Sequence, residues 1–103
     1  MSLKNEKIVI HADPELRELI PGYLKNRFAD ATDMMEAFLK NDYEKVRAVS
    51  HAIKGSGGGY GFDGMTEIAG ALEQAAKTHD ATVVRQHLDL LIDYLTRVEV
   101  SDE

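Results

Sequence analysis

The chain has 103 residues, of which 44% are hydrophobic and 29% charged, as in a single soluble globular domain. It contains no cysteine, which excludes disulfides and thiolate metal sites and agrees with a reducing compartment, so we expect a cytoplasmic protein. The net charge of −6 argues against a nucleic-acid partner. The apolar runs are far shorter than the roughly 20 residues of a membrane span, so we expect no membrane contact by this chain.

The first predicted elements are a short helix and a long one. Asp13–Pro14 combines an N-cap residue with a proline at the first helical position, and it predicts a short helix over Glu15–Ile20. Pro21 marks the start of a longer helix that reaches Lys40. Met34 of this longer helix is also predicted to pack in the core. The apolar line of this helix, spaced by three and four residues, comprises Leu24, Phe28, Ala31, Met35 and Phe38.

Three further helices follow. Asn41–Asp42 should end the long helix and cap the next, Gly61 should end that helix, and Asp63 and Asp80 should cap the last two. The apolar line of the third helix comprises Val46, Val49, Ile53, Gly57 and Tyr60. That of the fourth comprises Met65, Ile68, Ala69, Leu72, Ala75 and Ala76. That of the fifth comprises Val84, Leu88, Leu91, Leu95 and Val98.

The predicted fold is all-α. The apolar segment 7–10 is too short and too close to the terminus to count as a strand, and no other segment alternates with period two. Connections of about two to five residues favour antiparallel neighbours. The sequence therefore predicts an up-down-up-down four-helix bundle with a short extra N-terminal helix. We assign the domain to residues 12–99, with an N-terminal tail at 1–11 and a C-terminal tail at 100–103; residues 1–3, read as vector-derived, are left out of the fold prediction.

His51 is the residue whose position points to chemistry. At about 100° per residue, it lies roughly 160° from the middle of the third helix's apolar line and should face water. Lys54 lies one turn further on, and the face also carries Glu44, Arg47, Ala48, Gly55 and Gly58. A neutral imidazole is a good nucleophile near pH 7, a neighbouring lysine offsets phosphate charge, and small residues leave room for a partner's active site. An ordinary surface histidine has the same exposure, so the geometry alone leaves both interpretations open.

The glycine-rich stretch after His51 conflicts with the helical pattern around it. Each glycine inside a helix costs about 1 kcal/mol relative to alanine, and such conflicts tend to occur at functional places. Gly55 and Gly58 lie on the His51 face. Gly57 lies on the apolar line, where it would let a neighbouring helix approach closely, and no role follows for Gly59.

The segment from His51 to Gly61 resembles the signature of histidine-containing phosphotransfer (HPt) domains. That signature is a histidine with a lysine three residues later, a glycine four later and a second glycine ten later, and His51, Lys54, Gly55 and Gly61 match it. The likeness runs from about residue 12 to residue 98. The chain departs from many relatives at the run of glycines 57–59, which leaves the regularity of the third helix beyond residue 56 an open question.

The resemblance implies a phosphoryl carrier. His51 would be phosphorylated on Nε2, Lys54 would support the phosphoryl group, and Gly55 would permit docking. The partners would be response-regulator receiver domains, a hybrid sensor histidine kinase, or both, and each receiver would supply the aspartate and the Mg²⁺. The carrier itself would need no cofactor, and we expect a monomer. The chain has no ATP-binding segment, so it would not be an enzyme, unlike a parent hybrid kinase from which it could be cut.

Three other functions are weighed against this one. A phosphate-binding enzyme is disfavoured because the glycine tract lies at a helix end, where the helix dipole repels anions, and because Tyr60 breaks the G-x-G-x-x-G pattern. A metal site is disfavoured because the histidines form no His-x-x-x-His or Glu-x-x-His pair. The remaining alternative is a degenerate HPt-like docking module that binds receivers without being phosphorylated, which the presence of both His51 and Lys54 argues against.

Overall fold

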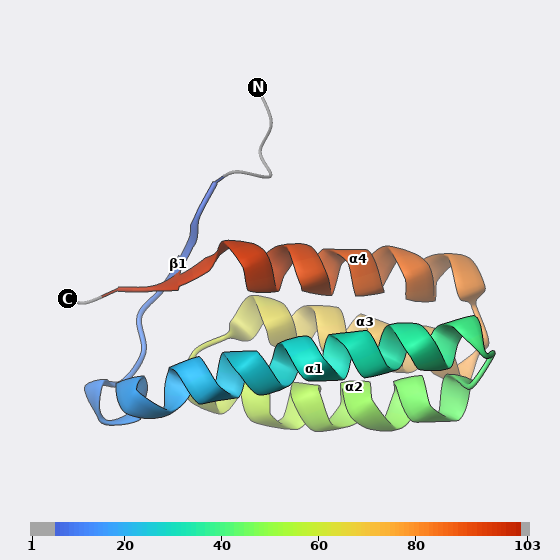
Figure 1. Cartoon of the computed structure of the whole chain (residues 1–103), viewed down its shortest axis with the longest axis horizontal. Coiled ribbons are helices and arrows are strands. Elements are labelled where there is room, and N and C mark those ends of the chain that lie inside the picture. The colour runs from blue at the N-terminus through green and yellow to red at the C-terminus, as the bar shows by residue number, and fades with distance from the viewer. Residues whose placement is uncertain (1–5, 102–103) are drawn as a thin grey trace.

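The computed structural model describes residues 6–101, most of which form a four-helix bundle. The helices are α1 (Ile20–Leu39), α2 (Tyr43–Gly57), α3 (Asp63–Lys77) and α4 (Ala81–Arg97). Each helix packs on the next, and α4 packs on α1, which closes the bundle (Figure 1). Because the connections are short, consecutive helices run antiparallel. The predicted all-α four-helix bundle is confirmed.

Three helices of the bundle end in the same hydrogen-bonded motif. The last residue of each motif's turn has a left-handed backbone: Asn41 (φ 60°), Gly61 (φ 90°) and His79 (φ 54°). The following N–H then bonds to a carbonyl five residues back, at 2.8 Å for Asp42 to Ala37, 2.9 Å for Phe62 to Gly57 and 2.9 Å for Asp80 to Ala75. This is the Schellman arrangement, which satisfies the free carbonyls of a helix end. The predicted helix end at residue 41 is therefore confirmed, whereas α2 itself ends at Gly57 and Gly61 ends the 3-10 turn that follows it.

Two of the following helices begin with the predicted aspartate caps. The side chains of Asp42 and Asp80 accept hydrogen bonds from the backbone N–H groups three residues later, at 3.1 and 3.2 Å. The cap predicted at Asp63 is wrong: Phe62 occupies the N-cap position, and Asp63 is the first residue of α3. Its negative charge still favours the helix start, because the dipole is positive there.

The two ends of the chain hold the main departures from the predicted fold. β1 (Ile8–Ile10) pairs in parallel with β2 (Val98–Val100), so part of each predicted tail is paired strand (Figure 1). Three-residue strands are too short for a period-two pattern to be recognised, and their partner lies at the other end of the sequence. Consequently α4 stops at Arg97. Val98, which was predicted to lie in this helix, begins β2 instead. Residues 1–5 and 102–103 of the predicted tails lie outside the described residues.

The short N-terminal helix is also different from the prediction. It is a 3-10 helix over Pro14–Leu19, not a helix over residues 15–20, and α1 begins directly at Ile20. Asp13 caps it as expected, accepting a hydrogen bond from the N–H of Glu15 at 2.9 Å. Since the element is 3-10, its six residues turn more tightly than an α-helix would.

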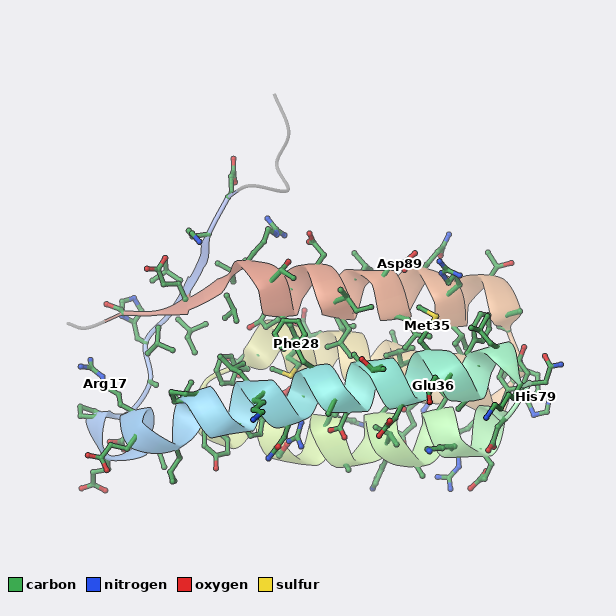
Figure 2. The ribbon with its side chains drawn as sticks, in the orientation of Figure 1. Arg17, Phe28, Met35, Glu36, His79 and Asp89 are labelled. Atoms are coloured by element: carbon green, nitrogen blue, oxygen red, sulfur yellow. The ribbon has the colours of Figure 1, made fainter. Side chains whose placement is uncertain are left out.

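The buried face of α1 is rotated from the predicted one. Its buried residues are Ile20, Tyr23, Ala31, Met34 and Ala37. Phe28, predicted as core, is 38% exposed, whereas Met34 is fully buried. Figure 2 shows Phe28 and Met35 on the edge of α1 that is directed toward α4. Apolar residues extend over more of this helix than one narrow line, so periodicity alone did not select which of them point at the core.

The closest helix pair is α2 with α3, and Gly57 makes that approach possible. Gly57 is buried, and a Cβ placed on it would lie 2.6 Å from Thr66 Oγ1 and 3.4 Å from the Phe62 carbonyl oxygen. The close approach predicted for this glycine is therefore confirmed. Beyond it the chain tightens into a 3-10 turn over Gly58–Tyr60. The ring of Tyr60 stacks on Tyr23 of α1 with centroids 4.2 Å apart, which anchors this end of the bundle.

A methyl group at Gly57 should therefore destabilise the protein. We expect Gly57→Ala to lower the free energy of unfolding by about 1–3 kcal/mol, because Thr66 is β-branched and has little freedom to move away. Gly58→Ala is the matched control: nothing lies within 4 Å of its Cβ, and its φ of −63° suits alanine. It should be neutral or stabilising by up to about 1 kcal/mol. Urea denaturation of the two variants measures both values, and equal destabilisation would contradict the packing role of Gly57.

Candidate functional site

His51 projects from the middle of α2 into solvent. Its side chain is 69% exposed, while Val46, Ser50 and Ile53 on the opposite side of the helix are buried. The exposure predicted from the helical wheel is therefore confirmed. By contrast, His87 on α4 is only half-buried and its Nδ1 lies 2.9 Å from the Val83 carbonyl oxygen, an ordinary contact within its own helix.

The imidazole of His51 is held from α3 by Glu73. His51 Nδ1 lies 2.7 Å from Glu73 Oε2, and the Glu73 side chain is only 5% exposed. An ionised carboxylate can only accept, so Nδ1 carries the proton and donates it to Glu73. In the neutral imidazole the other nitrogen, Nε2, then has the free lone pair. The contact thus selects both the orientation of the ring and its nucleophilic atom.

Lys54 contributes a positive charge to the same carboxylate. Its Nζ lies 3.6 Å from Glu73 Oε1, and its side chain is 48% exposed. The aliphatic stem passes over Gly70 of α3, where an added Cβ would lie 3.8 Å from Lys54 Cδ. The lysine therefore lies across the α2–α3 seam and shares the Glu73 carboxylate with His51.

The charge state of Glu73 follows from these neighbours. Burial by itself would raise the pKa of Glu73, but the hydrogen bond from His51 and the positive charges of His51, Lys54 and Lys77 outweigh it, so the pKa is lowered. Glu73 is therefore a carboxylate at neutral pH. A charge so little exposed is tolerated because it is paired and hydrogen-bonded.

The other predicted site residues surround His51 on the surface of α2. Arg47 Nε donates to both carboxylate oxygens of Glu44, at 3.1 and 3.0 Å. This hydrogen bond lowers the pKa of Glu44 and raises that of Arg47. Ala48, Gly55 and Gly58 are exposed, and nothing lies within 4 Å of a Cβ placed on either glycine. The face around His51 is open enough for another protein to approach.

Glu73 is the residue in contact with His51 that the sequence did not single out. On a wheel for α3 it falls roughly 100° from the middle of the apolar line, at its border. A carboxylate at such a border is normally a surface residue. Its burial results from the packing of α2 on α3, which the sequence pattern does not describe. The sequence held one signal for Glu73: it directly follows the core residue Leu72, inside the segment that resembles the HPt family.

No group of three or more histidine, cysteine, aspartate or glutamate side chains that could hold a metal occurs among residues 6–101. Over the same residues, no helix is both long and apolar enough to cross a membrane. What the structure places at the site is an exposed histidine on a helical bundle, with a carboxylate behind it and a lysine beside it.

This arrangement suits a helical phosphotransfer module. The family model described as the Hpt domain matches residues 22–101, and the chain belongs to this family. HPt domains act as phosphoryl carriers in phosphorelay signalling and interact with receiver domains and kinases. Comparisons with curated proteins and with solved structures gave no significant match.

The pairing of Glu73 should appear in the pH dependence of stability. The folded-state pKa lies below the usual 4.5, so the carboxylate stabilises the folded protein above about pH 4.5, and this contribution is lost as the pH falls through the lowered pKa. Relative to Glu73→Gln, the wild type should therefore lose stability on acidification below that pH. Urea denaturation at a series of pH values measures the difference. Glu67→Gln, which removes an exposed carboxylate from α3, is the control, and a difference independent of pH would contradict the ionic pairing.

Proposed function

We propose that this protein accepts a phosphoryl group on His51 Nε2 from the aspartyl phosphate of a receiver domain and passes it to another receiver. The observation that carries the proposal is the exposed imidazole whose Nδ1 is held by the buried Glu73 carboxylate at 2.7 Å. The carrier would work in the cytoplasm as a monomer, with the receiver or a hybrid sensor kinase as partner. It would need no cofactor of its own, since the receiver brings Mg²⁺.

The forward step can be written with the groups present. The Nε2 lone pair attacks phosphorus, the bond from phosphorus to the aspartate oxygen breaks, and the receiver's carboxylate leaves. The imidazole becomes positively charged because Nδ1 keeps its proton. Glu73 faces this charge directly, so its carboxylate stabilises the phosphorylated ring in the way that an aspartate supports the histidine of a catalytic triad.

The reverse step uses the same proton. When a second receiver's aspartate attacks the phosphoryl group, the bond from Nε2 to phosphorus breaks and the electrons return to the ring. Because Nδ1 is still protonated, the imidazole leaves as a neutral group rather than as an anion. The contact with Glu73 therefore supports both acceptance and donation, as a carrier between two receivers requires.

Lys54 supports the transferred group by its charge. A phosphoryl group brings a charge close to −2, and the ammonium lies one helical turn from His51. Phosphoryl transfer depends mainly on positioning and charge stabilisation. His51 therefore needs no general base to activate Nε2 if the partner supplies the metal. The small residues Ala48, Gly55 and Gly58 would allow the receiver's active site to close over the imidazole.

The proposal is tested by transfer from a phosphorylated receiver domain in the presence of Mg²⁺. Wild type should acquire an acid-labile, alkali-stable label, and His51→Gln should acquire none while keeping its helical circular dichroism spectrum. Label on both proteins would mean that another residue is the acceptor. Absence of label on wild type across a panel of receivers would favour the alternative, a docking module without phosphorylation.

Glu73→Gln tests the part played by the carboxylate. The amide keeps the size of the side chain and can still accept from Nδ1, but it carries no charge to stabilise the phosphorylated ring. A hydrogen bond between a charged ring and a carboxylate is stronger than one to a neutral amide, so we expect transfer to slow roughly ten-fold. Rapid-quench measurement of the transfer rate checks this. Glu67→Gln should transfer at the wild-type rate, and an equally fast Glu73→Gln would exclude an electrostatic role.

A further inference from the structure

We propose that Arg47 is a second phosphate-binding residue, whose guanidinium exchanges Glu44 for the phosphoryl oxygens when His51 is phosphorylated. The inference rests on the proposed function, because it needs a phosphoryl group on His51. It assigns the ion pair of Glu44 and Arg47 a role in the chemistry: Glu44 holds the arginine aside in the resting protein and releases it to the phosphorylated one.

Arg47 is placed close to His51 along α2. Arg47 precedes His51 by four residues, so the two side chains lie on one ridge of α2, about 40° apart around the helix. Helical side chains lean toward the N-terminus of their helix, which directs the His51 imidazole over the turn that carries Arg47. Lys54 lies one turn away on the other side. A phosphoryl group on Nε2 would therefore have a cation before it and a cation after it along α2.

Two carboxylates act on the charge of Arg47. The hydrogen bond to Glu44 and the charge of Glu44 are the main reasons why the pKa of Arg47 is raised, and the charge of Glu73 raises it further. The guanidinium is thus within electrostatic range of the carboxylate that holds His51. A doubly charged phosphoryl group on the same imidazole would act on Arg47 with a larger charge.

Glu44 and a phosphoryl group differ as partners of Arg47. The Glu44 side chain is 73% exposed and that of Arg47 is 34% exposed, so water competes for both groups and their pair is easily broken. A phosphoryl group has three acceptor oxygens and nearly twice the charge of a carboxylate, and it matches the two parallel N–H groups of a guanidinium. Arg47 therefore exchanges Glu44 for the phosphoryl group once His51 is phosphorylated.

Lys54 does not make this arginine redundant. Its ammonium is a point charge already directed at Glu73 Oε1, 3.6 Å away. Arginine adds a planar pair of donors, which both neutralises and orients the phosphoryl group. Removing Glu44 should therefore strengthen binding of the phosphoryl group by Arg47, whereas removing Arg47 should weaken it.

The test measures the phosphoryl group itself. His51 is phosphorylated either by the receiver of the transfer assay or by phosphoramidate, whose bond from phosphorus to nitrogen breaks as Nε2 bonds to phosphorus and ammonia leaves. Phosphorus-31 NMR between about pH 6 and pH 9 then gives the second pKa of the bound phosphoryl group. The side-chain Nε–H resonance of Arg47 is followed by nitrogen-15 NMR before and after phosphorylation.

We expect Arg47→Gln to raise the phosphoryl pKa by roughly 0.3–1 unit, because a nearby cation favours the dianion. Glu44→Gln should lower it or leave it at the wild-type value, and Arg47→Lys should give an intermediate value. Lys45→Gln is the matched control, since it removes an exposed cation about 120° from His51 around α2. It should match the wild type, and the Arg47 Nε–H resonance should shift on phosphorylation.

An identical phosphoryl pKa in wild type and Arg47→Gln, with an unmoved Arg47 resonance, would overturn this inference and leave the carrier function standing. An equal pKa rise in Lys45→Gln would also overturn it, because the effect would then reflect overall charge. A wild type that neither donor phosphorylates, or a phosphorus signal that persists in His51→Gln, would overturn the carrier function and the role of Arg47 with it.

Discussion

The hydrogen bond between His51 and Glu73 depends on how closely α2 packs on α3. Gly57 allows this approach, because any larger residue would meet Thr66 at 2.6 Å. The packing that results buries Glu73 at the seam while His51, on the outer edge of α2, stays 69% exposed. One helix therefore presents an imidazole to the solvent, and its neighbour holds that imidazole from behind. A bundle with wider α2–α3 spacing would have the same residues without the contact.

A buried carboxylate has to be compensated by positive charge, and this requirement explains the composition of the site. Burial alone would raise the pKa of Glu73, yet His51, Lys54 and Lys77 lower it. The pairing keeps a proton on Nδ1 and leaves Nε2 free for chemistry. Charge compensation and the choice of the free nitrogen are thus consequences of one contact. A phosphoryl group on Nε2 would add negative charge to the same ring, between Arg47 four residues before it and Lys54 three residues after it on α2.

The sequence predicted best those features that depend on local chemistry. The caps at Asp42 and Asp80 and the left-handed end at Gly61 were predictable because capping involves residues only a few positions apart. The exposure of His51 followed from helical periodicity. Phe28 was misassigned to the core because apolar residues cover a wide part of α1, and only the packing of its neighbours decides which ones point inward. The pairing of β1 with β2 was missed because each strand has three residues and its partner lies at the opposite end of the chain.

By itself, then, the sequence determined the four helices, the caps at Asp42 and Asp80, and the candidate histidine and lysine, because periodicity, capping and a short motif are all local properties. Tertiary structure alone decided that Glu73 is the partner of His51 Nδ1. These residues stand on different helices, and their 2.7 Å contact depends on the distance and rotation of one helix against the other. The same packing decided which nitrogen of His51 is free, since a proton's position depends on the acceptor that the fold brings to it.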